Sequence, residues 1–513
     1  MKFKVAPGRI ELFLLLLLIV ATLWLRLSSL GYSDYQGDEI KAFCRPEAGQ
    51  NLADFLLGQR KGPVQFLIAC ATSAFDPGYS NAALIRLPFA IASVLAVFTF
   101  YLLVKMHFGN RVGLYSALLM ATNGFFVGFG RIVQYQSITI MCTVAALYFL
   151  TLAGRSTRWK LSGLYIASAL AAIGILAHFD GVFVIPPALY LVLVWFQRWK
   201  KETGTSTCWK HLFFAAGLSL GLLAVFYLPY ALSLSSYQVD YWSERIYGTT
   251  TSSVDLFRLT NPLFVFPLYL ALAALSLVRV RWNDAYRFLA LWFLPAFFFM
   301  AWFMKDSRSH IYTFLIPLMI LVALGIETVE IALQRLLAEK LRWLPQLVGV
   351  TLFILLSFMS YTLFVDHQRE YPWESKRFLL WELESSKLQG MMGFPYRREW
   401  SAIGELFRDM QKDDEIWFTT NEKLAIVEFY LPENMRFQEI KPETVEQMKE
   451  DQSMYAIVIE RPQSFLESPP QITSKNWRST FTPIQTFTDE NDRLLASVYH
   501  LAKKDLESIL SAQ

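Results

Sequence analysis

The stretch IELFLLLLLIVATLWLRLSSL, residues 10–30, decides the fold class of this chain. About 20 apolar residues are enough for a helix to cross a bilayer, and this run has that length. Lys2, Lys4 and Arg9 precede it, as basic residues precede a secretory signal peptide, but its apolar core is too long and no small-x-small cleavage site follows. We therefore expect a permanent membrane anchor.

Further apolar runs follow along the first two thirds of the chain. Of the 513 residues, 54% are hydrophobic and only 18% are charged, whereas soluble domains are about a quarter charged. The sequence therefore predicts an α-helical polytopic membrane protein with about 11 transmembrane helices. The expected spans are residues 10–30, 85–104, 112–129, 136–153, 161–177, 182–197, 211–232, 261–278, 288–304, 312–331 and 345–365.

Lysine and arginine are distributed unevenly between the short connections. Alternate connections, beginning with the N-terminus, hold 18 of these residues, and the intervening short ones hold only Arg131, Arg245, Arg258, Lys305 and Arg308. Cytoplasmic loops carry the excess of positive charge. We therefore expect a cytoplasmic N-terminus and, after an odd number of spans, a periplasmic or extracellular C-terminus.

The first outer loop, residues 31–84, is long and contains two apolar segments too short to span a membrane. These segments, LADFLLGQ at 52–59 and VQFLIACATSAF at 64–75, are expected to lie along the membrane interface. Cys44 and Cys70 lie on the same loop. They either pair, if the loop faces an oxidising compartment, or remain two partly buried thiols.

The composition changes after residue 366. Residues 367–513 carry 18 Lys and Arg against 25 Asp and Glu. Alternating patterns predict helices at 399–411 and 423–431 and strands at 415–420, 454–460 and 493–502. We therefore expect two domains, a transmembrane domain at 1–366 and a small extracytoplasmic α/β domain at 367–513. An acidic domain without a Gly-rich phosphate loop is not expected to bind nucleic acid.

Two carboxylates follow the anchor closely, in the segment YSDYQGDEIKAF at 32–43. Asp38, close to lipid and protein of low dielectric, has the chemistry of a general base. Together with Glu39 it also offers oxygen ligands to a hard divalent cation such as Mg²⁺ or Mn²⁺. The alternative is a solvated acidic turn, and a single Asp-Glu pair does not decide between these interpretations.

Basic and aromatic side chains gather at the same predicted face of the membrane. Lys61, Arg131, Lys305 and Arg308 either bind phosphate oxygens or extend toward lipid headgroups. Four further residues either line a substrate groove or belong to the interfacial aromatic and polar belt, namely Tyr135, His178, His310 and Tyr312. Asp180 and Asp306 are expected on the same face.

The order of these features resembles the polytopic glycosyltransferases that use polyprenyl-phosphate sugars, which include bacterial aminoarabinose transferases and protein O-mannosyltransferases. The matching segments, in order, are GDEIKAF at 37–43, KGPVQF at 61–66, RLPFAIASVLAVFTFYLL at 86–103, FGNRVGLYSALLMAT at 108–122, GRIVQYQSITIMCTVAALYFL at 130–150 and HIYTFLIPLMILVALGIE at 310–327. The resemblance covers about the first 330 residues.

The resemblance implies a GT-C fold in a cell inner (plasma) membrane, with a role in lipopolysaccharide or glycoprotein biosynthesis. It implies transfer of a hexose or pentose from a polyprenyl-phosphate carrier to a lipid, glycan or protein acceptor at the outer face. Asp38 would act as the base, Glu39 would assist or bind a metal, and the four cations would bind the donor phosphate. Many members have a second acid at the entry to the fourth span, where this chain has Gln134, Tyr135 and Gln136.

A transporter or lipid-linked sugar flippase is the alternative function. Such proteins commonly show internal repeats and ionisable residues at mid-membrane depth. The predicted spans show no obvious repeat and no Asp or Glu at that depth. The pattern therefore favours the enzyme.

Overall fold

The computed structural model describes residues 9–511 except 235–239, 241, 242, 244–252, 281, 306, 386–392, 411–414 and 464–473. The chain divides into two compact units. The first comprises residues 1–28, 44–75 and 85–366, and the second comprises residues 29–43, 76–84 and 367–513. The main part of the second unit therefore starts at the composition change after residue 366, and the unit also includes two pieces of the outer loop.

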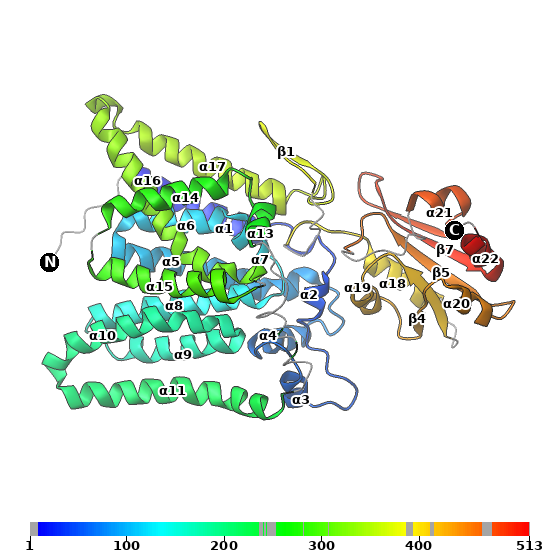
Figure 1. Cartoon of the computed structure of the whole chain (residues 1–513), viewed down its shortest axis with the longest axis horizontal. Coiled ribbons are helices and arrows are strands. Elements are labelled where there is room, and N and C mark those ends of the chain that lie inside the picture. Colours follow the sequence, from blue (N-terminus) through cyan, green and yellow to red (C-terminus); the bar gives the residue numbers. More distant parts are fainter. Residues whose placement is uncertain are drawn as a thin grey trace. The chain divides into compact units, whose positions relative to one another are not determined.

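The first unit is a bundle of long helices that run side by side (Figure 1). Within the described residues, eight helical segments are long and apolar enough to cross a membrane. The helices are α1 (Arg9–Leu27), α5 (Ala82–Phe108), α6 (Asn110–Thr122), α7 (Gly124–Phe129), α8 (Tyr135–Arg155), α9 (Ser162–Ala177), η1 (Phe179–Val184), α10 (Ile185–Thr203), α11 (Thr205–Leu232), α13 (Ser253–Thr260), α14 (Val265–Ser276), η2 (Leu277–Arg279), α15 (Asp284–Phe298), η3 (Phe299–Phe303), η4 (Arg308–Ile311), α16 (Tyr312–Leu336), η5 (Glu339–Leu341) and α17 (Leu344–Phe364).

Every predicted span corresponds to one of these helices or helix pairs, which confirms the polytopic helical architecture. The segments around 112–129, 161–177 and 261–278 are shorter than the other spans. The first of them is interrupted at Asn123, whose side chain accepts a hydrogen bond from the backbone N–H of Phe125 at 3.0 Å. Asn is a strong N-cap residue, so it ends α6 and begins α7.

The outer loop contains the short helices α2 (Gly37–Ile40), α3 (Leu52–Leu57) and α4 (Val64–Ser73). The predicted interfacial segments are therefore helical. In the first unit, Cys44 and Cys70 form a disulfide with a Cα–Cα distance of 4.9 Å. This bond ties the segment after α2 to α4.

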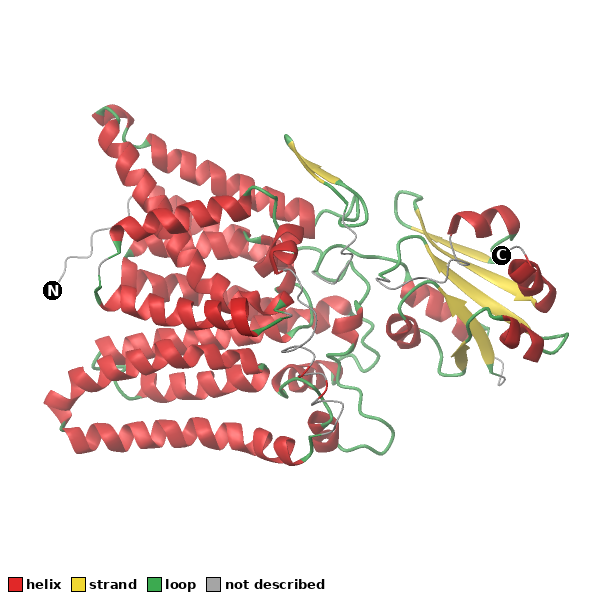
Figure 2. Ribbon diagram, in the orientation of Figure 1, coloured by secondary structure: helices red, strands yellow, loops and turns green. Residues whose placement is uncertain are grey.

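The second unit contains a mixed five-stranded sheet with helices (Figure 2). The strand order is β4-β3-β5-β7-β6, with β4, β3 and β5 parallel and β7 antiparallel to both of its neighbours. The elements are β1 (Lys376–Phe378), β2 (Trp381–Leu383), α18 (Trp400–Asp409), β3 (Ile416–Thr420), α19 (Leu424–Tyr430), β4 (Met435–Phe437), α20 (Pro442–Gln447), β5 (Ser453–Ile459), α21 (Ser474–Thr480), β6 (Gln485–Thr488), β7 (Leu494–Ala502) and α22 (Lys503–Ser511).

Alternating residues of β5 serve the two faces of this sheet. Met454, Ala456 and Val458 pack with α20, α21 and α22 in one apolar cluster. Tyr455 points to the other face, where its ring meets Phe407 of α18 at a centroid distance of 5.2 Å. This period of two is what a strand buried on both faces requires, and it confirms the α/β class predicted for the C-terminal residues.

Candidate active site around His178, Asp180 and His310

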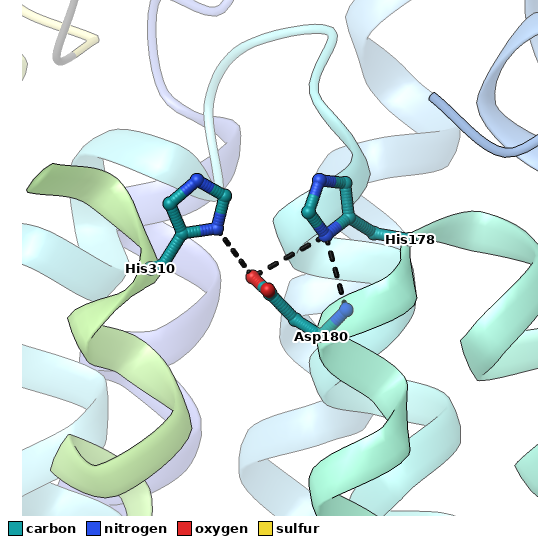
Figure 3. Close-up of side chains that lie close together, drawn as sticks. All are labelled: His178, Asp180 and His310. Carbon is teal, nitrogen blue, oxygen red and sulfur yellow. Dashed lines mark hydrogen bonds and ion pairs between the residues drawn. The ribbon is translucent and has the colours of Figure 1, made fainter. Parts of the chain in front are cut away.

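Three polar side chains meet inside the first unit (Figure 3). Oδ2 of Asp180 lies 2.6 Å from Nδ1 of His310 and 3.3 Å from Nδ1 of His178. All three residues are buried. Figure 3 shows the carboxylate between the two rings, with the second nitrogen of each ring directed away from it. Buried charges persist only when they are paired, so this cluster is a built polar site in an apolar bundle.

Local backbone geometry positions the first two of these residues. His178 is extended, with φ of −162°, and its Nδ1 accepts a hydrogen bond from the backbone N–H of Asp180 at 3.2 Å. Gly181 then approaches the end of α9 so closely that a Cβ would lie 2.6 Å from the backbone carbon of Gly174. The sequence HFDG therefore makes a tight connection that aims His178 and Asp180 in the same direction.

Lys61 joins this cluster from the outer loop. Its Nζ donates to Oε1 of Gln134 at 3.2 Å and lies 5.0 Å from the centre of the Tyr135 ring. That ring stacks on His178 at a centroid distance of 3.8 Å. The next residue, Gly62, leaves no room for a side chain, because a Cβ would lie 1.9 Å from the carbonyl oxygen of Leu176. A glycine after Lys61 thus lets the loop touch the end of α9.

Tyr312, at the start of α16, completes one side of the cluster. It is buried, and its hydroxyl lies near Asp180 and Thr139 without a hydrogen bond to either. The structure therefore brings together five of the predicted residues, namely Lys61, Tyr135, His178, His310 and Tyr312. It adds Asp180, which interacts with His178, His310 and Tyr312.

Arg131 occupies a different environment in the same unit. Its guanidinium donates to the carbonyl oxygen of Leu25 at 2.9 Å, which offsets the repulsion from the like charges of Arg26 and Arg86. Arg26 is fully buried and binds Oγ of Ser93 at 2.8 Å and the carbonyl oxygen of Ala121 at 2.9 Å. These hydrogen bonds connect the C-terminal ends of α1 and α6 to the middle of α5. Arg131 therefore has a structural role, and any role in binding phosphate would be additional to it.

Lys305 and Arg308 lie at the polar turn before α16, and both are exposed. The intervening Asp306 lies outside the described residues. Because α16 begins directly after His310 and Ile311, this turn belongs to the same end of the bundle as the His-Asp-His cluster.

Asp38 and Glu39 belong to the second unit. Glu39 is buried, and its Oε2 accepts a hydrogen bond from the backbone N–H of Gln36 at 3.1 Å, as in a capping box. Asp38 is exposed and interacts electrostatically with Lys423, whose pKa is lowered mainly by burial. Only Asp38 of this pair therefore presents its carboxylate to solvent.

Sequence reasoning missed two features of the site. Asp180 stood out as a polar residue on the outer face but carried no role, because nothing local shows that His310, 130 residues later, reaches it. In the sequence, Gln134 was notable only because many members of the resembled family have an acidic residue there. In the structure its side chain accepts a hydrogen bond from Lys61. The glycine at position 62 was the available signal for close packing.

Comparison with known proteins adds to this picture. The family model described as dolichyl-phosphate-mannose-protein mannosyltransferase matches residues 62–230. An undecaprenyl phosphate-α-4-amino-4-deoxy-L-arabinose arabinosyl transferase of Pseudomonas paraeruginosa is 26% identical over 265 residues, which are 47% of this chain and 44% of the relative. The match thus spans less than half the length of that curated relative.

Solved structures resemble the chain over almost its full length. ArnT from Cupriavidus metallidurans bound to undecaprenyl phosphate is similar with a TM-score of 0.52 and 12% identity, covering 97% of this chain and 98% of that one. The same protein in the apo state gives a TM-score of 0.51 with 12% identity, covering 96% and 97%. At this identity the likeness concerns the fold, and the chain therefore has the GT-C architecture that the sequence led us to expect.

Proposed function

We propose that this chain is a membrane glycosyltransferase that moves a sugar from a polyprenyl-phosphate carrier to a lipid, glycan or protein acceptor. The observation that carries the proposal is the position of Lys61, a cation fixed by Gln134 and Tyr135 beside a buried His-Asp-His cluster at the end of an apolar helical bundle. A charge in such a place is costly unless it is used. The matched family and the relatives add support, because their descriptions name polyprenyl-phosphate sugars.

In this proposal Lys61 binds the phosphate of the donor. Departure of the sugar leaves negative charge on the phosphate oxygens, and a preorganised cation stabilises that charge as it develops. Lys305 and Arg308 are exposed at the same end of the bundle and are proposed to assist in holding the phosphate. Tyr135, His178, His310 and Tyr312 would line the adjoining part of the groove.

Asp38 is proposed as the general base for the acceptor hydroxyl. Its carboxylate is exposed in the second unit, whereas that of Glu39 is occupied by its own helix cap. General base catalysis by a positioned carboxylate contributes about 10²–10⁴-fold to a rate. Assistance by Glu39, or metal binding by Asp38 and Glu39, remains a further prediction.

The same proposal places the outer loop and the second unit in the periplasm or outside the cell. The disulfide between Cys44 and Cys70 supports this orientation, because such bonds persist in oxidising compartments. The excess of basic residues in the alternate connections points the same way.

The experiment uses the purified full-length chain in lipid nanodiscs with undecaprenyl phosphate carrying radiolabelled aminoarabinose or mannose. We expect transfer of label to lipid A, an oligosaccharide or a peptide acceptor, and loss of transfer in Asp38→Asn. Binding of undecaprenyl phosphate alone is measured in parallel by native mass spectrometry. A chain that neither binds this lipid nor transfers label, but moves lipid-linked sugar across vesicles, would instead be a flippase.

A further inference from the structure

We propose that His178, Asp180 and His310 form a binding site for a divalent cation of the zinc type, with a fourth coordination position left open. The three ligand atoms lie within 4.8 Å of one another, and the side chains are between 1% and 4% exposed. They come from two separate elements, the η1 entry and η4. Packing of an apolar bundle does not require three buried polar side chains of the types that bind metals, so their convergence calls for another explanation.

Hydrogen bonding around His178 carries the argument furthest. Nδ1 of His178 accepts the backbone N–H of Asp180 at 3.2 Å and also faces Oδ2 of Asp180 at 3.3 Å. A ring nitrogen that accepts a hydrogen bond has no proton to donate to the carboxylate. Nδ1 is therefore unprotonated where it faces the carboxylate, as a metal ligand must be. Its single lone pair is engaged by the N–H, so a cation that binds both atoms replaces this hydrogen bond.

The distances fit a tetrahedral zinc site after a small adjustment. Zinc lies about 2.0–2.2 Å from nitrogen and oxygen ligands, so neighbouring ligand atoms of a tetrahedron are about 3.3 Å apart. The His178–Asp180 pair has this spacing, and the His310–Asp180 pair is closer, at 2.6 Å. An increase of less than about 1 Å in the His310–Asp180 distance would bring this pair to the same spacing, and the two Nδ1 atoms lie within 4.8 Å of each other.

The ligand types select the metal. Two imidazoles and one carboxylate suit zinc and related transition metals, whereas Mg²⁺ and Mn²⁺ prefer oxygen ligands. Three protein ligands with an open position are the arrangement of zinc ions that bind a further small ligand. Binding through Nδ1 requires the ring proton to be on Nε2, and both Nε2 atoms are directed away from the carboxylate (Figure 3).

The surroundings suit ligands that are held in place. The Tyr135 ring stacks on His178, and the Tyr312 hydroxyl lies close to Asp180. The stacked Tyr135 ring restricts the orientation of the His178 ring, as contacts around a metal site orient its ligands. This inference does not depend on the proposed sugar transfer, since metal binding is measured without any substrate.

The test measures bound metal directly. Full-length chain is purified in detergent with a tag that lacks histidine, loaded with buffered Zn²⁺, dialysed, and analysed by inductively coupled plasma mass spectrometry. We expect about one zinc per chain, with Mg²⁺ and Mn²⁺ failing to compete. Asp180→Asn and His310→Gln should each lose most of this zinc. The matched control is His211→Ala, because His211 lies in the same unit and is bound to Tyr165.

A second measurement covers variants that fold poorly. Loading wild-type chain with Co²⁺ should give the intense visible absorption bands of a tetrahedral site, and zinc should displace them. The proposal is overturned if wild-type chain retains no zinc after dialysis, or if Asp180→Asn and His310→Gln retain as much as the His211→Ala control. A site that fails this test would be a metal-free Asp-His pair.

Discussion

Individual charged residues in this chain are stabilised in two different ways, and the difference predicts what they do. Arg26 and Arg131 are bound to backbone carbonyl oxygens inside the bundle, so their guanidinium groups hold helices together. Lys61 is held by the amide oxygen of Gln134 and the aromatic face of Tyr135. Its ammonium group therefore lies beside the His-Asp-His cluster, where the donor phosphate is proposed to bind.

Lys61→Gln should accordingly lose most of the donor binding while leaving the fold intact. Removal of one preorganised hydrogen-bond donor to a developing negative charge lowers the catalytic rate about 10²–10³-fold. We expect a reduction of this order in kcat/KM for the polyprenyl-phosphate sugar. Native mass spectrometry with undecaprenyl phosphate measures the binding part. Lys201→Gln, at an exposed cytoplasmic-side position by the charge pattern, is the matched control. Equal donor affinity in both variants would remove Lys61 from the site.

Asp34 predicts a pH dependence of stability in the second unit. Burial raises the pKa of its carboxyl from 3.8 to about 6, although Oδ2 accepts the backbone N–H of Arg398 at 2.5 Å. Because the folded pKa lies above the unfolded one, the folded chain binds more protons between about pH 4 and 6. Stability therefore falls as pH rises through that window, by on the order of 3 kcal/mol.

In Asp34→Asn this fall should disappear, since the amide oxygen keeps the hydrogen bond and never ionises. Tryptophan fluorescence during thermal unfolding of the full chain, recorded from pH 4 to 8, measures the effect as the difference from wild type. Asp451→Asn, an exposed residue of the same unit, should leave the pH profile unchanged. Parallel profiles for wild type and Asp34→Asn would contradict the assignment.

At the scale of elements, the spans and the principal strands and helices of the second unit were predictable because each has a strong period or a long apolar run. The predicted strand at 454–460 corresponds to β5, Ser453–Ile459. The break of the third span was visible as Asn123–Gly124, but hydropathy alone does not register it. The short strands β1, β2, β4 and β6 were missed, because three or four residues give too little periodicity. Helices α20, α21 and α22 were also not predicted.

A substitution at Gly62 can test whether contact between the outer loop and α9 positions Lys61. A methyl group at this position would overlap the carbonyl oxygen of Leu176, so Gly62→Ala must push the outer loop away from α9 and displace Lys61 from Gln134. We expect a loss of transfer activity approaching that of Lys61→Gln. Gly58→Ala, where the new Cβ would lie an ordinary 3.5 Å from the nearest atom, should retain activity. Labelled sugar transfer in nanodiscs compares the two alanine variants.

At the scale of the whole molecule, the sequence predicts the structural class of each part well, but it predicts less well which residues come together in the site. Apolar length and charge composition separate residues 1–366 from 367–513, and the units divide after Asp366. The pieces 29–43 and 76–84 belong to the second unit, which no local pattern reveals. The same limit applies to the cluster, since His178 and Asp180, at the start of η1, meet His310 of η4 only in the folded bundle.

Orientation in the membrane is the property of the whole molecule that can be tested most directly. The uneven distribution of lysine and arginine predicts that residue 201 is cytoplasmic and residue 504 is outside. Native cysteines do not interfere, because Cys44 and Cys70 are bonded and Cys142 and Cys208 are buried. An impermeant maleimide applied to intact cells should therefore label Lys504→Cys and spare wild type.

Lys201→Cys should react only after the membrane is opened. Labelling of Lys201→Cys in intact cells, with protection of Lys504→Cys, would reverse the orientation and move the proposed site to the cytoplasmic face. The Cys44–Cys70 bond gives an independent check, because cells treated with a reductant should expose two new thiols on the outer loop. Both experiments depend only on topology, so they test the predicted outer location of the site without assuming its substrate.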